Sequence, residues 1–211
     1  MFYETTSIDR ALRFGDIVQG FISCTPNIDD PTISTHNYTY QIEISSQPFF
    51  VILSPCCSIR DKVISLTPLI KLRGTFFNNP FFVDDLTRIN RPVAPEHSLP
   101  PSAWESMEPE EKAGRLRSAP GYVSLECFIY EKHDFFHEYT ISRREGNIST
   151  RYYMIDFRYT FRVHCDKINS PRDAPIDVKR LQLTIDTRSE LRDKISYYYS
   201  RVPNEDLVSI A

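Results

Sequence analysis

Two adjacent cysteines, Cys56 and Cys57, are the most pointed chemical feature of the sequence. They follow an apolar run at residues 49–53, in the turn Ser54-Pro55-Cys56-Cys57-Ser58. A thiol in such a turn can be exposed, and Arg60 or Lys62 would lower its pKa. The alternative is that each cysteine is a small buried hydrophobic residue, because no histidine lies close in sequence to act as a base. Cys57 is therefore a weak candidate for catalysis, and for redox or metal sensing.

The histidines offer no convincing metal site. His133 and His137 are four residues apart, which is a metal-ligand spacing on a helix, but the segment around them is aromatic and β-prone. Positions four apart lie far from each other along a strand. His164-Cys165 lacks a Cys-x-x-Cys motif to complete a ligand set. We predict no metal site and no cofactor.

Adjacent phenylalanines occur at 76–77, 81–82 and 135–136. Neighbouring residues of a strand point to opposite faces, so one member of each pair would need a second covering layer. An aromatic pair can also stack on single-stranded nucleic acid or anchor a protein partner. We assign Phe77 and Phe82 to partner contact, with ordinary core packing as the alternative.

The C-terminal segment predicts an amphipathic helix over 187–202. Thr187-x-x-Glu190 fits a capping box, and apolar residues recur at intervals of four, three and four residues. Those residues are Leu191, Ile195, Tyr198 and Val202. Three consecutive tyrosines cover almost a full turn, so at least one points away from the apolar stripe. We predict that Tyr197, Tyr199 and Arg192 contact a partner.

The rest of the chain is rich in strand-forming residues. Aromatic residues make up 13% of the sequence and only six residues are glycine, which favours sheet. Strand-like segments are expected at 16–24, 38–45, 49–53, 63–66, 122–130, 137–142, 151–163 and 179–185. Prolines concentrate between residues 84 and 120, around a charged helical piece. We predict a mainly β (α+β) single domain over 1–211, with 84–120 as an insertion.

Composition excludes several classes of protein. No apolar run approaches the roughly 18 residues that a membrane-spanning helix requires, and the N-terminal residues lack the pattern of a secretory signal. The formal charge of −3 gives no general attraction for nucleic acid. The five cysteines are odd in number and scattered. We expect a cytoplasmic protein without disulfides or membrane contact.

Three segments resemble the opening of MazF/PemK-like proteins, which are SH3-like β-barrels. They are Phe14-Gly15-Asp16-Ile17-Val18, Pro48-Phe49-Phe50-Val51-Ile52-Leu53-Ser54 and Val63-Ile64-Ser65-Leu66-Thr67-Pro68-Leu69. The turn at 54–59 and the helix SELRDKISYYYSR are similar to uncharacterised prokaryotic proteins that carry a Ser-x-x-Cys-Asp-like turn. Such proteins often occur near toxin or phage-defence genes. The resemblance therefore implies an SH3-like barrel and an accessory role in defence.

The same resemblance argues against nuclease activity. A MazF-type endoribonuclease has a basic residue before the second-strand proline, where this chain has Gln47, and a hydroxyl where it has Ile70. Substitutes in the vicinity, which are weak catalytic candidates, are Arg60, Thr67 and Arg73. An endoribonuclease would bring these three residues together in one exposed groove.

The leading hypothesis is a non-catalytic, protein-binding regulatory or accessory component of a prokaryotic defence or toxin-linked system, the CRISPR-associated kind included. The sequence leaves two alternatives open. One is a diverged MazF-like endoribonuclease or RNA-binding protein, and the other is a cysteine-based redox or metal sensor.

Overall fold

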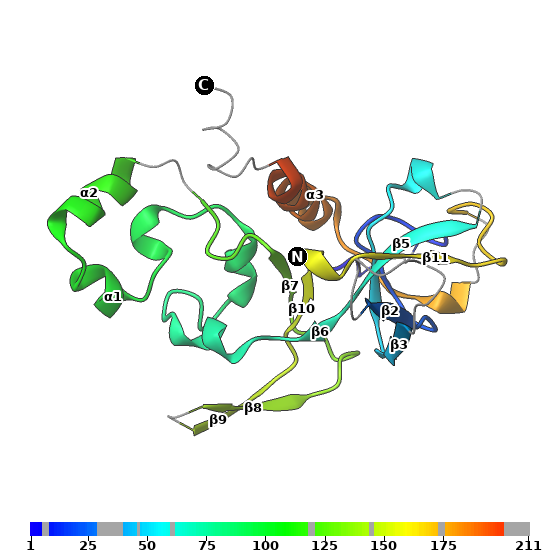
Figure 1. The fold of residues 1–211 in the computed structure, drawn as a ribbon, viewed down its shortest axis with the longest axis horizontal. Helices are drawn as coiled ribbons and strands as arrows, with labels where there is room; N and C mark the ends of the chain where they lie inside the picture. The colour runs from blue at the N-terminus through cyan, green and yellow to red at the C-terminus, as the bar shows by residue number, and fades with distance from the viewer. Residues whose placement is uncertain are drawn as a thin grey trace. The chain divides into compact units, whose positions relative to one another are not determined.

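The computed structural model describes residues 1–5, 9–28, 40–45, 47–59, 62–117, 121–143, 146–172 and 176–200 (Figure 1). In these residues the chain forms twelve β-strands in four sheets, together with three α-helices and several short 3₁₀ helices. The strand-rich, mixed α and β composition is confirmed. No closed barrel occurs among the strands that the structure describes.

The chain divides into two compact units, each built from separate stretches of sequence. Unit 1 comprises Met1–Glu4, Ile70–Arg158 and the chain from Leu183 onward; unit 2 comprises Thr5–Leu69 and Tyr159–Gln182. The composition of the sequence gave no sign of this division within the expected single domain, 1–211.

Unit 2 is organised around a five-stranded antiparallel sheet. Its strands are β1 (Ile17–Val18), β4 (Phe50–Ile52), β5 (Val63–Pro68), β11 (Phe161–His164) and β12 (Lys179–Leu181), in the order β11-β5-β4-β1-β12. One face of the sheet carries an apolar core. That core consists of Leu12, Val18, Phe50, Ile52, Ile59, Ile64, Leu66 and Ile168.

The β5 and β11 strands alternate between this core and the opposite face. Ile64 and Leu66 are fully buried, whereas Ser65 between them is only half-buried. Strand pairing places Arg162 of β11 directly opposite Ser65. Cross-strand partners share a face of the sheet, so Arg162 and Ser65 both lie on the face away from the core.

A buried ion pair fixes the segment that leads into β1. The Lys179 ammonium lies 2.7 Å from the Asp16 carboxylate, and both side chains are almost completely buried. The same ammonium donates hydrogen bonds to the carbonyl oxygens of Asp9 and Ala11 and to the side chain of Gln182. With all of its donors paired, Lys179 ties the N-terminal segment of unit 2 to β12.

Unit 2 also contains a separate two-stranded hairpin, formed by β2 (Ser23–Ile28) and β3 (Tyr40–Ser45). Both strands have six residues and pair with each other over their whole length. Neither pairs with another strand of the described chain, so each keeps one unpaired edge.

Unit 1 contains two further sheets. The three-stranded sheet has the order β6-β10-β7, and the second is the hairpin of β8 and β9. The bounds are β6 (Ile70–Lys71), β7 (Cys127–Tyr130), β8 (Tyr139–Arg143), β9 (Gly146–Thr150) and β10 (Tyr153–Asp156). The central strands β7 and β10 are buried along their whole length.

The expected insertion at 84–120 begins as part of the core of unit 1. Its first element, η4 (Leu86–Asn90), packs against β7, and Asn90 pairs with the backbone of Ile129. The Asn90 amide donates to the Ile129 carbonyl oxygen, and its oxygen accepts from the Ile129 N–H, both at 2.7 Å. Two α-helices follow, α1 (Pro101–Glu105) and α2 (Pro109–Arg117), the second beginning at the proline expected in its first turn.

The C-terminal helix is confirmed, with a different cap. Helix α3 spans Ile185–Ser200, and Leu191 lies buried on its inner face. Thr187 lies inside the helix, and the cap is Thr184, whose hydroxyl accepts the Thr187 N–H at 3.4 Å. The predicted capping box at Thr187 is therefore wrong by one turn, and Val202 lies outside the described residues.

The remaining short elements are 3₁₀ helices: η2 (Cys56–Ser58), η3 (Gly74–Asn78), η5 (Pro95–His97), η6 (Phe157–Tyr159) and η7 (Ile176–Val178). None of the helices in the described ranges is long and apolar enough to cross a membrane.

Candidate functional site

The cysteine turn forms the short helix η2 at the end of β4. Pro55 ends the extended chain, and Cys56, Cys57 and Ser58 follow as one exposed turn. Both thiols are exposed, so the alternative that each cysteine is a small buried hydrophobic residue is wrong. The Cys57 sulfur lies 3.9 Å from the Ser58 hydroxyl, a weak contact. Arg60, one of the two cations expected beside the thiols, lies outside the described residues.

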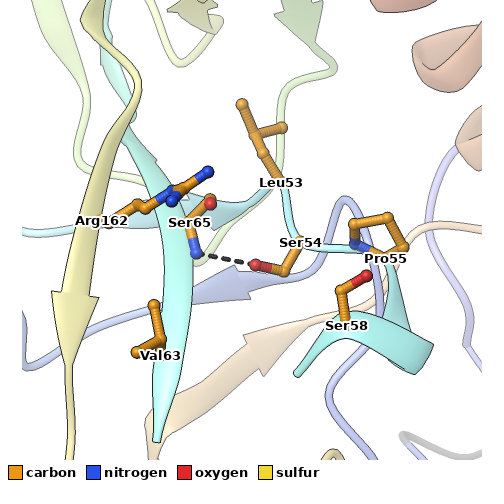
Figure 2. A pocket seen from close by; sticks show the side chains of 7 residues that line it. All are labelled: Leu53, Ser54, Pro55, Ser58, Val63, Ser65 and Arg162. Atoms are coloured by element: carbon orange, nitrogen blue, oxygen red, sulfur yellow. Dashed lines mark hydrogen bonds between the residues drawn. The ribbon is translucent and has the colours of Figure 1, made fainter. Parts of the chain in front are cut away.

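A pocket of about 410 Å³ opens beside this turn (Figure 2). It lies within unit 2, between the chain that leaves β4 and the paired strands β5 and β11. We call it the serine–arginine pocket, and it is lined by Leu53, Ser54, Pro55, Ser58, Val63, Ser65 and Arg162. Four of these residues, at positions 55, 58, 63 and 162, are exposed, so the pocket is open to solvent.

Polar groups converge on the pocket from four segments of the chain. The Ser54 hydroxyl, after β4, accepts the backbone N–H of Ser65 on β5 at 2.7 Å. Ser58 comes from η2, and Arg162 comes from β11 on the same sheet face as Ser65. Figure 2 shows the guanidinium of Arg162 beside Ser65, and the Ser58 side chain directed toward Ser54 and Pro55.

The charge that lines the pocket is positive. Among the residues that the structure describes, Arg162 is the one charged residue of the lining, and no acidic residue contributes to it. Close in sequence, the ammonium of Lys62 lies 2.9 Å from the Asp166 carboxylate. The hydrogen bond from Lys62 lowers the pKa of Asp166, so this carboxylate is engaged by its own cation. The pocket can therefore bind an anion through one guanidinium and several hydroxyls.

Ser65 and Arg162 are not among the site residues predicted from the sequence. The alternation of Arg162 and His164 with apolar neighbours indicates a shared strand face, which is a local signal. The pairing of β11 with β5 joins residues almost a hundred positions apart, and no short motif specifies it.

Two of the catalytic candidates are already engaged in the structure. Thr67 is 0% exposed on β5, so its hydroxyl does not line an exposed groove. Arg73, in unit 1, lies 3.0 Å from the Glu126 carboxylate and 2.6 Å from that of Asp156. Burial raises the pKa of Asp156, but hydrogen bonds from Arg158 and the charge of Arg73 bring it below its ordinary value. Arg73 therefore holds a structural ion-pair network together.

The phenylalanines predicted to contact a partner are buried. Phe77 and Phe82 both belong to the core of unit 1, and the guanidinium of Arg88 lies 5.9 Å from the Phe82 ring. Their assignment to partner contact is corrected to core packing. The sequence pattern misled because these segments are a 3₁₀ helix and irregular chain, in which adjacent side chains can both point inward.

The outer face of α3 has the exposure that was predicted for it. Tyr197 is 55% exposed and Tyr199 is 63% exposed, and Arg192 is also exposed. Tyr197 packs on the ring of Tyr122 at 5.7 Å, and the Tyr199 hydroxyl donates to the Phe157 carbonyl oxygen at 3.2 Å. Their contact with a partner stays a prediction.

The β2–β3 hairpin presents a second apolar surface. Ile42 and Ile44 are 57% and 65% exposed, and exposed Cys24 lies opposite Ile44. Residues two apart share a strand face, so these three side chains form one patch, which we call the isoleucine face. The alternation at 38–45 predicted a half-buried strand, but Ile42 and Ile44 of β3 are open to solvent.

A lysine is buried in the core of unit 1. Lys194 on α3 has no exposed surface, and its ammonium donates to the Ile89 carbonyl oxygen at 2.9 Å and lies 5.1 Å from the Tyr122 ring. Burial lowers the pKa of Lys194 to about 8. Because this carbonyl lies in the last turn of the 3₁₀ helix η4, the lysine serves as a structural cap there.

The described residues contain no group of three or more histidine, cysteine, aspartate or glutamate side chains able to hold a metal ion. His133 instead packs against the rings of Tyr3 and Phe136.

Comparison with known proteins found no matching family, no similar curated protein and no similar solved structure. The likeness to MazF/PemK-like proteins stays a prediction from the short motifs quoted above.

Proposed function

We propose that the chain is a non-catalytic protein-binding component that serves a prokaryotic defence or toxin-linked system as a regulatory or accessory subunit. The isoleucine face of the β2–β3 hairpin is the observation that carries the protein-binding part. The assignment to a defence system rests on the resemblance of the turn at 54–59 and of the C-terminal helix.

The isoleucine face has the chemistry of a protein contact. Full burial of an isoleucine side chain is worth roughly 1.5–3 kcal/mol, and Ile42 and Ile44 each leave more than half of their surface in water. Contiguous exposed apolar side chains are a feature of protein-interaction surfaces. A partner that covers both isoleucines would recover much of this free energy.

The hairpin also offers a backbone contact. Each of its strands has an edge without a strand partner in the described chain, so its N–H and C=O groups are available for strand addition. The occupant that fits both properties is a protein segment in extended conformation with apolar side chains at alternate positions. Nucleic acid supplies neither.

The fold that we propose for unit 2 is a diverged SH3-like barrel. Five short antiparallel strands, three of which come from the segments that resemble the MazF/PemK-like opening, support it. In a closed barrel the two edge strands of this sheet, β11 and β12, would pair with each other. The barrel that we propose is open between them.

The test is affinity purification from the native host with two matched variants. Ile42→Ser with Ile44→Ser removes the apolar side chains of β3, and Glu43→Gln changes the residue between them on the opposite face. Co-eluting protein and RNA are identified separately after washing at moderate salt. We expect a stoichiometric protein that is retained by wild type and by Glu43→Gln and lost from the double variant.

Three results would overturn the proposal. A partner that the double serine variant still retains would remove the isoleucine face from consideration. RNA without protein would favour the nucleic-acid alternative. Light scattering that shows a homodimer abolished by the serine substitutions would mean that the face serves self-association.

The two alternatives have less support. Buried Thr67 and the engaged Arg73 leave the endoribonuclease hypothesis without an exposed groove built from its candidates. The sensor hypothesis retains two adjacent exposed thiols, Cys56 and Cys57.

A further inference from the structure

We propose that the serine–arginine pocket binds the phosphate group of a small phosphomonoester, such as a mononucleotide. The groups that would hold the phosphate are the guanidinium of Arg162 and the hydroxyls of Ser54, Ser58 and Ser65. This proposal is independent of the protein-binding role, because it rests on the pocket and not on the hairpin.

The charge of the pocket selects an anion. Arg162 has no hydrogen bond or ion pair with any residue of the described chain, so its five N–H donors have no protein acceptor there. A guanidinium binds phosphate through two parallel N–H···O bonds, which is stronger and more directional than a single ammonium contact. In the described part of the chain no carboxylate lines the pocket to compete for it.

The hydroxyls are arranged as donors. Because the Ser54 oxygen already accepts the Ser65 N–H at 2.7 Å, its own proton is available for a ligand oxygen. Ser65 lies on the same sheet face as Arg162 and directly opposite it, so one ligand group can contact both. A phosphate has three terminal oxygens, which gives the guanidinium and the hydroxyls separate acceptors.

The size of the pocket selects an ester rather than the bare ion. A volume of about 410 Å³ lies within the range of about 300–1,000 Å³ that is typical of sites for small organic ligands. A phosphate fills only part of it. The remaining wall is apolar, formed by Leu53, Pro55 and Val63, and suits the sugar or base of a nucleotide.

Nuclear magnetic resonance titration of the full chain tests the proposal. The backbone amide of Ser65 is the reporter, because its N–H donates a hydrogen bond to the Ser54 hydroxyl, which lines the pocket. Isotope-labelled protein is titrated with inorganic phosphate, with adenosine monophosphate, and with a short oligoribonucleotide that carries either a 5′-phosphate or a 5′-hydroxyl. The variants are Arg162→Met, Arg162→Lys and Ser65→Ala, with Arg172→Met as the control at another exposed arginine of unit 2.

We expect a saturable shift of the Ser65 amide with adenosine monophosphate, and a weaker one with phosphate. Arg162→Met should weaken nucleotide binding at least tenfold, Arg162→Lys and Ser65→Ala less, and Arg172→Met should not change it. Arg162 is exposed, and a well-dispersed spectrum of each variant shows that it is folded.

Equal affinity in Arg162→Met and wild type would overturn the proposal, as would the absence of any saturable shift. Arg162-dependent binding of the 5′-phosphorylated oligoribonucleotide without binding of adenosine monophosphate would also overturn it, because the ligand would then be an RNA end. None of these results bears on the Ile42 and Ile44 test, so the two proposals can fail separately.

Discussion

Replacement of the buried Lys194 tests whether its ammonium lies in the core of unit 1. Burial brings the pKa of Lys194 from its ordinary 10.5 to about 8 in the folded chain. A lysine whose pKa falls on folding binds its proton more weakly in the native state than in the unfolded state. Unfolded chains therefore hold more protons between pH 8 and 10.5, and stability must rise with pH across that window.

The magnitude follows from the size of the shift. Below pH 8 the protonated Lys194 lowers the free energy of unfolding by about 3 kcal/mol relative to an unshifted lysine. Raising the pH from about 7 to about 9.5 should restore about 2 kcal/mol of this, since most native molecules then carry a neutral amine. Lys194→Met removes the titrating group and keeps a similar side-chain length, so this contribution should vanish.

Urea denaturation at the two pH values provides the assay. Wild type should gain about 2 kcal/mol relative to Lys194→Met between the lower and the higher pH. Lys167→Met, at an exposed lysine of unit 2, should follow the wild type and serves as the control. If wild type and Lys194→Met show the same dependence on pH, the ammonium does not lie in a desolvated site, and the reasoning is refuted.

Three further predictions concern other parts of the chain. Asp16→Asn leaves the Lys179 ammonium buried without its counter-charge and should lower the free energy of unfolding by about 3–5 kcal/mol, measured in urea; a loss below about 1 kcal/mol would mean that the pair is solvated. Asn90→Ala leaves the buried N–H and carbonyl of Ile129 unpaired and should cost about 2–4 kcal/mol by the same measurement, and a neutral result would mean that water replaces the amide. In native protein a thiol reagent should modify three cysteines rapidly and Cys127 only after denaturation, because burial shields that thiol and raises its pKa; rapid native reaction of Cys127 would contradict its burial. The three are Cys24, Cys56 and Cys57.

Local patterns predicted the elements of the fold better than their surroundings. The helix over 187–202 was readable because its apolar residues recur with the helical period, and the structure places Leu191 on its buried face. The predicted N-cap was wrong because Thr184 and Thr187 have the same side chain and either could cap a helix. Which of them does so depends on where the helix begins, and that is visible only in the structure.

Pairings between distant segments could not be predicted. The opposition of Ser65 and Arg162 depends on which strands become neighbours, which is decided by packing of the whole sheet. The burial of Phe77 and the exposure of Ile44 were unpredictable for the same reason, because both depend on contacts between distant segments. Composition ranks both residues as core formers, and only the tertiary structure shows which of them finds a covering layer.

The candidate site shows the same division. Cys56 and Cys57 lie in a short turn after an apolar strand, but the sequence left both burial and exposure of their thiols open, and only the structure shows that they are exposed. Arg73 was selected because it is a cation close to the third strand of the resemblance. Its partners, Glu126 and Asp156, come from sequence far downstream, and they determine what that cation does.

The division of the chain into interleaved units constrains its synthesis. Tyr3 forms a β-bridge with Leu183, so unit 1 contains chain from both sides of unit 2. During synthesis Tyr3 must wait for the chain as far as Leu183 before its bridge partner emerges from the ribosome. Such late closure of long-range pairs slows folding and leaves apolar segments uncovered in the meantime, which makes nascent chains dependent on chaperones. No cut at a single point in the sequence would release either unit intact, so expression of contiguous fragments should yield aggregates.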